Sequence, residues 1–173
     1  MRAAAGWCAA LVALAAGAMA SGAEAHVIVQ PTEAPADSYA QLTFVVPHGC
    51  AGSATIALRL RVPEGVLSAK PQMKPGWSVE VKTKDLAQPV AGPHDHSISK
   101  AVEEVIWRGG PLPDDLFDSF GLIVRLPDRP GQRLAFPVVQ ECEHGVANWT
   151  EVPAEGRKAE YPAPAVRLKA GAH

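Results

Sequence analysis

The sequence contains no block of basic residues and no acidic or basic tail. Its 16 Lys and Arg residues nearly balance its 18 Asp and Glu residues, and the formal net charge is −2. Because nucleic-acid binding depends on a concentrated positive surface, we expect no nucleic-acid partner. The Gly-x-Ser-x-Gly nucleophile elbow, the His-Glu-x-x-His zinc motif and a glycine-rich phosphate loop are absent as well. The sequence therefore gives no support to nucleophilic or phosphate chemistry.

Long hydrophobic runs are equally scarce. The one clear run extends from Cys8 to Ala20, follows Arg2 and precedes Ala23-Glu24-Ala25. A short positive start, an apolar run and a small-x-small tripeptide are typical of a secretory signal peptide, which we predict for residues 1–25. The run is too short for a comfortable membrane span. We therefore expect a soluble periplasmic or secreted protein with no membrane span after signal cleavage.

Cysteine is scarce too. Cys8 leaves with the signal, so the mature chain keeps only Cys50 and Cys142. Exported compartments are oxidising, and an even number of cysteines in an exported chain predicts disulfides, here a single one. On the chain-entropy model, closing so long a loop stabilises the fold by about 4–5 kcal/mol. The alternative is that both thiolates bind copper.

Helical periodicity is missing once the signal is removed, and alternation of apolar and polar residues takes its place. The 16 prolines and 15 glycines mostly lie between the alternating stretches. Strands are predicted at 41–46, 55–62, 77–83, 103–107, 121–126, 134–139 and 148–152. Short strands divided by frequent turns predict an all-β fold, specifically a two-sheet immunoglobulin-like β-sandwich.

The mature chain is long enough for one domain with a sizeable core. We place that domain at residues 26–153. Residues 154–173, rich in alanine, proline and charge, are predicted to be a C-terminal tail that ends in an edge strand near 165–168. The longest segment without strand character is 87–100, which we predict to be a mobile loop.

Cleavage after Ala25 would make His26 the first residue of the mature protein. A histidine in that position offers its α-amine and its ring Nδ1 to one metal ion, in a single chelate ring that suits Cu(II). An internal histidine cannot form this chelate. Ala18-Met19-Ala20 is a competing cleavage site, and its use would leave His26 five residues inside the chain. Copper binding by His26 therefore depends on where the signal is cut.

A Cu(II) ion held by one histidine needs an anionic oxygen from elsewhere in the chain. Glu33 lies near His26 in sequence, and Asp118 lies between two phenylalanines, where a carboxylate needs a partner. We rank these two acids first. Three more acids flank Trp149 and remain alternatives, namely Glu141, Glu143 and Glu151. For each acid the competing interpretation is a solvated surface residue.

The other histidines offer further nitrogen ligands. His94 and His96 are two residues apart in the predicted loop, a spacing that can clamp a metal but also occurs in ordinary polar loops. His144 lies in a Glu-His-Gly turn near Trp149 and can supply a second nitrogen. His48 is expected to be a turn residue.

Six short motifs follow one another from His26 onward. They are His-Val-Ile-Val-Gln-Pro from His26, Val-Pro-His-Gly-Cys from Val46, Val-Pro-Glu-Gly-Val from Val62, Lys-Pro-Gly-Trp from Lys74, Phe-Asp-Ser-Phe from Phe117, and Gln-Glu-Cys-Glu-His-Gly from Gln140. In this order, with Trp149 after them, they resemble the YcnI-like family of exported copper-binding domains. The resemblance implies a β-sandwich whose N-terminal histidine holds Cu(II) in a mono-histidine brace. A carboxylate completes that site, a tryptophan lies beside the metal, and the implied role is copper storage, delivery or homeostasis outside the cytoplasm.

Carried over onto this sequence, the resemblance makes His26 the brace histidine and Trp149 the tryptophan beside the metal. The competing interpretation of Trp149 is a core aromatic packed against the disulfide. Trp77 and Trp107 lie in alternating strands and are expected to be core residues.

Three functions remain open. We favour a non-catalytic Cu(II)-binding protein that exchanges its ion with a copper transporter or another exported copper-binding protein. The second is a copper oxygenase, which needs another histidine to complete a plane of three nitrogens, from His144 or from the pair His94 and His96. The third is a metal-free sandwich that binds another exported protein. The fold alone does not choose among them, because function lies in the site.

The first residue of the exported protein decides whether the chelate can form. We expect His26 at that position when the secreted protein is analysed by Edman degradation or by intact mass. A mature sequence that starts at Ser21 would exclude the brace.

Overall fold

The computed structural model describes residues 26–92, 97–153 and 157–171. The predicted signal peptide, His94 and His96 lie outside these ranges. Within them the chain forms strands and no helix, so the all-β prediction is confirmed. The described residues consequently include no helix with the length and apolar character needed to cross a membrane.

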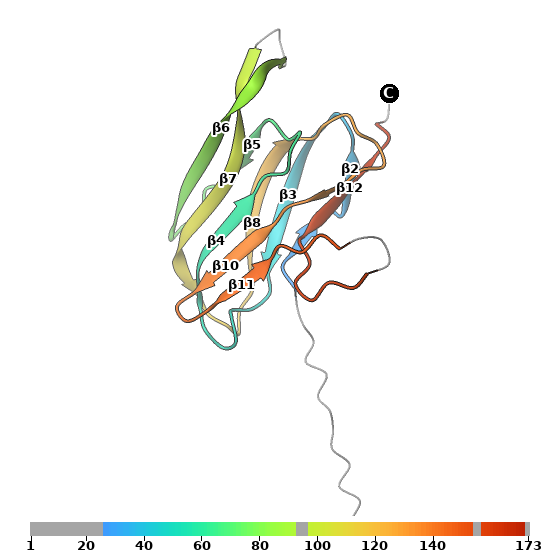
Figure 1. Cartoon of the computed structure of the whole chain (residues 1–173). Coiled ribbons are helices and arrows are strands. Elements are labelled where there is room, and N and C mark those ends of the chain that lie inside the picture. The colour runs from blue at the N-terminus through green and yellow to red at the C-terminus, as the bar shows by residue number, and fades with distance from the viewer. Residues whose placement is uncertain (1–25, 93–96, 154–156, 172–173) are drawn as a thin grey trace, which may run out of the picture.

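The strands form three sheets, and two of these face each other as the layers of a sandwich (Figure 1). The first layer has the order β1 (Ile28–Gln30), β3 (Tyr39–Val46), β8 (Asp118–Arg125) and β5 (Ala69–Pro71). The second layer has the order β11 (Val146–Trp149), β10 (Val138–Cys142), β4 (Thr55–Arg61), β7 (Ser97–Leu112) and β6 (Trp77–Ala91). The small third sheet has the order β2 (Glu33–Pro35), β12 (Ala165–Lys169) and β9 (Arg133–Ala135). Only β2 and β12 pair in parallel, and the other neighbours are antiparallel.

The core lies between the layers and is built from the inward positions of alternating strands. Every second residue of β3 from Leu42 to Val46 is buried, as the alternation predicts. Trp107 of β7 is fully buried and packs edge-to-face on Phe120 of β8, with ring centroids 5.5 Å apart. Trp77 is half-buried against the same phenylalanine, at 5.0 Å. Both tryptophans therefore belong to the core packing, as expected.

The predicted single strand at 134–139 is wrong, because this segment forms parts of two strands. The chain changes sheets at Phe136 and Pro137: β9 pairs with β12, whereas β10 pairs with β4 and β11. Phe136 donates its N–H to the carbonyl of Pro164 at 2.8 Å, and Pro137 has no N–H to give to a ladder. Burial of every second residue continues across the break, so the alternation did not reveal it.

The predicted mobile loop at 87–100 is also wrong. β6 continues to Ala91 and β7 begins at Ser97, so both ends of this segment belong to a hairpin that projects beyond the sandwich (Figure 1). Pro89 lies where the pairing register is interrupted, between Asp85 and Val90. Most residues of this extension are exposed on both faces, so backbone pairing forms it without any alternation of apolar and polar residues.

The C-terminal strand forms where it was predicted, but it does not lie at an edge. β12 runs between β2 and β9, and its residues Val166 and Leu168 are buried in the common core. The short strands β1, β2 and β5 were not predicted. Each has three residues, too few to carry a recognisable alternation.

The predicted disulfide between Cys50 and Cys142 is confirmed, with Cα atoms 6.0 Å apart. Cys50 lies in the loop that follows β3, and Cys142 is the last residue of β10. The bond therefore ties a loop of the first layer to a strand of the second. Because both sulfurs are bridged, neither is a thiolate ligand for copper.

Reduction of this disulfide should lower the free energy of unfolding, by about 4–5 kcal/mol if loop closure in the unfolded chain dominates. The measurement is urea denaturation with and without reductant, alongside a Cys50→Ala/Cys142→Ala double variant. After alkylation, mass spectrometry should find two modified thiols only in the reduced sample. Two modified thiols in the untreated mature protein would contradict the assignment.

Candidate metal centre

His26 lies two residues before β1 and is half-buried at one end of the first layer. The pairing of β1 with β3 runs from Ile28 opposite Val45 to Gln30 opposite Thr43. Val27 and Val29 are buried in the core, with exposed fractions of 2% and 3%. The residues just after His26 are therefore anchored, which gives the histidine a defined place.

The His26 ring packs edge-on against the indole of Trp149, with ring centroids 5.5 Å apart and planes at 74°. Trp149 ends β11, which belongs to the opposite layer. The structure thus brings together the two residues that the resemblance assigns to the metal and its surroundings. Trp149 is also buried in the main core cluster, as a core aromatic would be.

Gln140 of β10 holds Trp149 from within the core, and the sequence analysis did not single it out. The Trp149 Nε1–H donates to Gln140 Oε1 at 3.0 Å. The Gln140 Nε2 group donates to the His48 carbonyl and to the Thr55 hydroxyl, both at 2.7 Å. Gln140 is fully buried and shares the inward face of β10 with Cys142. The sequence could have indicated Gln140, because it is a polar residue at an inward position of an alternating strand. A buried amide requires hydrogen-bond partners, so such a residue is expected to hold its neighbours in place.

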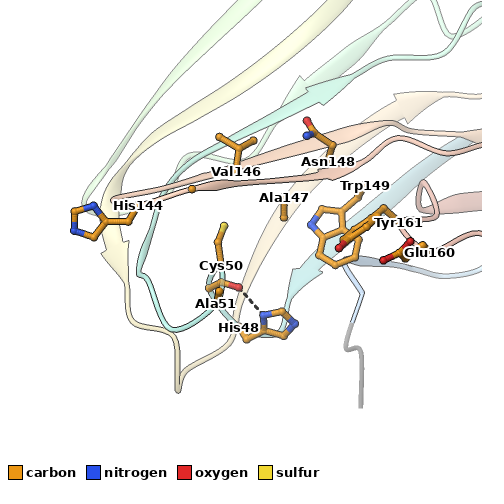
Figure 2. A pocket seen from close by; sticks show the side chains of 12 residues that line it. His48, Cys50, Ala51, His144, Val146, Ala147, Asn148, Trp149, Glu160 and Tyr161 are labelled. Carbon is orange, nitrogen blue, oxygen red and sulfur yellow. Dashed lines mark hydrogen bonds between the residues drawn. The ribbon is translucent and has the colours of Figure 1, made fainter. Parts of the chain in front are cut away.

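A pocket of about 600 Å³ opens beside Trp149 (Figure 2). Its walls come from the loop after β3, from β11 with the turn before it, and from the segment that leads to β12. This volume is within the range of small-molecule sites and much larger than a single ion requires. His48 lies on one wall, whereas Glu160 and Tyr161 lie on the wall next to Trp149.

Glu160 is the only acid among the described residues that line this pocket. The next residue, Tyr161, places its ring centroid 5.5 Å from that of Trp149. Glu151 ties this segment to the end of β11, because its carboxylate accepts the N–H of Glu160 and its own N–H donates to the Tyr161 carbonyl, both at 3.0 Å. The sequence analysis missed Glu160 because it lies in the predicted tail, where no strand pattern places it.

The two carboxylates that were ranked first lie in ion pairs elsewhere. Asp118 begins β8, and its Oδ1 is 2.5 Å from Lys74 Nζ and accepts the N–H of Ser119 at 2.7 Å. Glu33 lies in β2, and its Oε2 is 2.6 Å from Lys169 Nζ. Neither acid is among the described residues that line the pocket, and His26 is not among them either, since it adjoins the pocket only through its contact with Trp149.

The histidines near the pocket do not converge. His144 is exposed, and its ring points away from Trp149 at the far end of the pocket (Figure 2). His48 Nδ1 lies 2.6 Å from the carbonyl oxygen of Gly49, in a loop as expected. Across the described ranges, no group of three or more His, Cys, Asp or Glu side chains is placed to hold a metal ion.

A cluster of linked ion pairs lies away from the pocket, on the outer face of the second layer. Glu104 contacts Arg59 at 3.1 Å and Lys82 at 2.9 Å, and Glu141 contacts the same arginine at 3.4 Å. Burial raises the pKa of the Glu104 carboxyl, but hydrogen bonds from Lys82 and Arg59 outweigh it and hold the pKa below its usual value. Glu141 therefore belongs to a group of paired charges on this outer face.

Residues 26–168 match the family model described as Domain of unknown function (DUF1775). A crystal structure of an uncharacterized protein from Nocardia farcinica, described as having an immunoglobulin-like fold, is similar to this chain. The TM-score is 0.65 and the sequence identity 27%, over 83% of this chain and 98% of that one. No curated protein matches this chain. The similarity confirms the predicted immunoglobulin-like fold, and because the family match spans most of the sequence, the chain belongs to the DUF1775 family.

Proposed function

We propose that this protein is an exported Cu(II)-binding protein that holds one ion through its mature N-terminal histidine. The observation that carries the proposal is the contact between the His26 ring and the Trp149 indole, 5.5 Å between centroids. The resemblance to YcnI-like domains makes His26 the metal ligand and places Trp149 beside the metal. Copper storage, delivery or homeostasis in the periplasm or outside the cell follows from that assignment and from the predicted signal peptide.

His26 supplies two ligands only if it is the first residue, through the α-amine and ring Nδ1. Both nitrogens bind one Cu(II) ion in the same chelate ring. The burial of Val27 and Val29 holds this residue at the end of the sheet, so the two nitrogens need little further ordering. Since each must lose a proton to bind, the copper affinity falls as the pH is lowered.

The third ligand in the proposed site is a carboxylate, and Glu160 is the best-placed candidate. It is the only acid among the described pocket-lining residues, and it adjoins Tyr161, which contacts Trp149. Asp118 and Glu33 remain alternatives. Each of them would first have to give up an ion pair with a lysine, at 2.5 and 2.6 Å respectively.

These ligands fit a carrier better than an enzyme. An oxygenase with a histidine brace needs a third nitrogen in the copper plane. The His144 ring points away from Trp149 (Figure 2), and His94 and His96, the other candidates, lie outside the described residues. A carrier needs only to hold and release its ion, for which two nitrogens and a carboxylate suffice. The proposed partners are a copper transporter or another exported copper-binding protein.

The mature protein that starts at His26 should bind about one equivalent of Cu(II) more weakly at lower pH, because both nitrogens must be deprotonated. Its EPR spectrum should show two nitrogen ligands. His26→Ala, and a variant with one extra alanine ahead of His26, should lose tight binding because each change breaks the chelate ring. Competitive titration against a chelator measures the affinities, and His144→Ala serves as the matched control that keeps the parent affinity.

Unchanged affinity in the extended variant would refute the proposal. A third coupled nitrogen that disappears in His144→Ala would instead favour the copper oxygenase.

Glu160→Gln removes the charge of the proposed carboxylate at nearly constant size. We expect this substitution to weaken Cu(II) binding roughly tenfold or more. Loss of a residue that only hydrogen-bonds to a metal ligand already has an effect of that size, and a direct ligand should matter at least as much. Asp118→Asn and Glu33→Gln are the matched controls and should bind as the parent does in the same titration. A loss confined to one of these controls would transfer the carboxylate role to that residue.

A further inference from the structure

We infer that Gln140 is a positioning residue of this site: its buried side-chain amide sets the orientation of Trp149 and holds the His48 loop against β10. The part of this inference that concerns copper affinity rests on the proposed function. Its structural part, the orientation of the indole, can be measured without metal.

Among the described residues, Thr55 and Gln140 are the only polar ones that are buried, and they are bonded to each other. An apolar side chain is the ordinary choice at an inward position of a sandwich strand. The polar content of this core is therefore concentrated directly behind the residue that contacts His26.

The hydrogen bonds allow only one orientation of the amide. Gln140 Oε1 accepts from the Trp149 indole, while Nε2 donates to the His48 carbonyl and to the Thr55 hydroxyl. Both N–H groups and the oxygen are thus engaged. An amide turned by 180° would set an N–H against the indole N–H and an oxygen against the His48 carbonyl, so two attractive contacts would become repulsive.

The same residue connects two walls of the pocket. Trp149 and His48 both line it, and each is bonded to the Gln140 side chain. The backbone of Gln140 pairs with Leu58 on one side and Ala147 on the other, so the amide projects from a strand that is held at both edges. The disulfide, two residues further along β10, ties the same loop a second time.

If Gln140 Oε1 is removed, the indole N–H of Trp149 loses its hydrogen-bond acceptor. The indole can then reorient, and its edge-on contact with His26 is lost or altered. Outer groups that orient the immediate surroundings of a metal typically change its affinity roughly 10- to 100-fold when they are lost. We expect a change in this range for Gln140, although it does not touch the ion.

The experiment compares Gln140→Met with Thr55→Val in the mature protein that starts at His26. Gln140→Met removes the bond to the indole at similar volume, whereas Thr55→Val removes one bond of the amide and leaves the indole bond intact. Two-dimensional ¹H–¹⁵N NMR records the Trp149 indole signal, identified by its absence in Trp149→Phe. Urea denaturation records stability, and chelator competition records the Cu(II) affinity.

In Gln140→Met the Trp149 indole signal should shift, its hydrogen exchange should accelerate, and the Cu(II) affinity should fall roughly 10- to 100-fold. In Thr55→Val the indole signal and the copper affinity should stay as in the parent, while stability falls. Should Gln140→Met fail to fold, the parent protein is itself the test, because an indole N–H bonded to Gln140 within the core should exchange slowly with solvent.

Equal losses of affinity in Gln140→Met and Thr55→Val would show that both act through core stability alone, and would overturn the inference. So would parent-like copper binding in Gln140→Met, or rapid exchange of the Trp149 indole hydrogen in the parent protein. If the parent protein binds no copper while the indole signal still depends on Gln140, the proposed function fails and the positioning of Trp149 stands.

Discussion

The pairing of β1 with β3 is the constraint on which the candidate site depends. Here three consecutive residues, Ile28 to Gln30, pair with β3, and the flanking Val27 enters the core together with Val29. These contacts position His26 at the end of the first layer, where its ring packs against Trp149 of the second layer.

A buried polar cluster supports the other side of this contact. An amide buried without partners costs about 1–3 kcal/mol, and Gln140 avoids that cost with bonds to Trp149, His48 and Thr55. The disulfide lies next to this cluster, since the Thr55 hydroxyl is 3.8 Å from the sulfur of Cys142. The Gln140 bond to His48 and the disulfide both hold the loop after β3 to β10, so this wall of the pocket is fixed at two points.

The immunoglobulin-like sandwich itself says little about activity, because folds of this kind carry many unrelated functions. The arguments for function come instead from one end of the molecule, where His26, Trp149 and Glu160 come from three distant parts of the chain. The outer face of the second layer has a different character. Its acids and bases pair with one another, as Glu104 does with Arg59.

The sequence by itself determined the strand class of the fold, the disulfide and the candidate histidine. An alternation such as that of 41–46 states which residues face inward, the two cysteines after the predicted signal allow only one pair, and one of the two cleavage patterns would make His26 the N-terminus. Only the tertiary structure decided the change of sheet at Pro137, the strand pairing within 87–100, and the approach of Gln140 and Glu160 to Trp149. The physical reason is that these features arise from hydrogen bonds and contacts between distant segments, which leave no periodic trace along the chain.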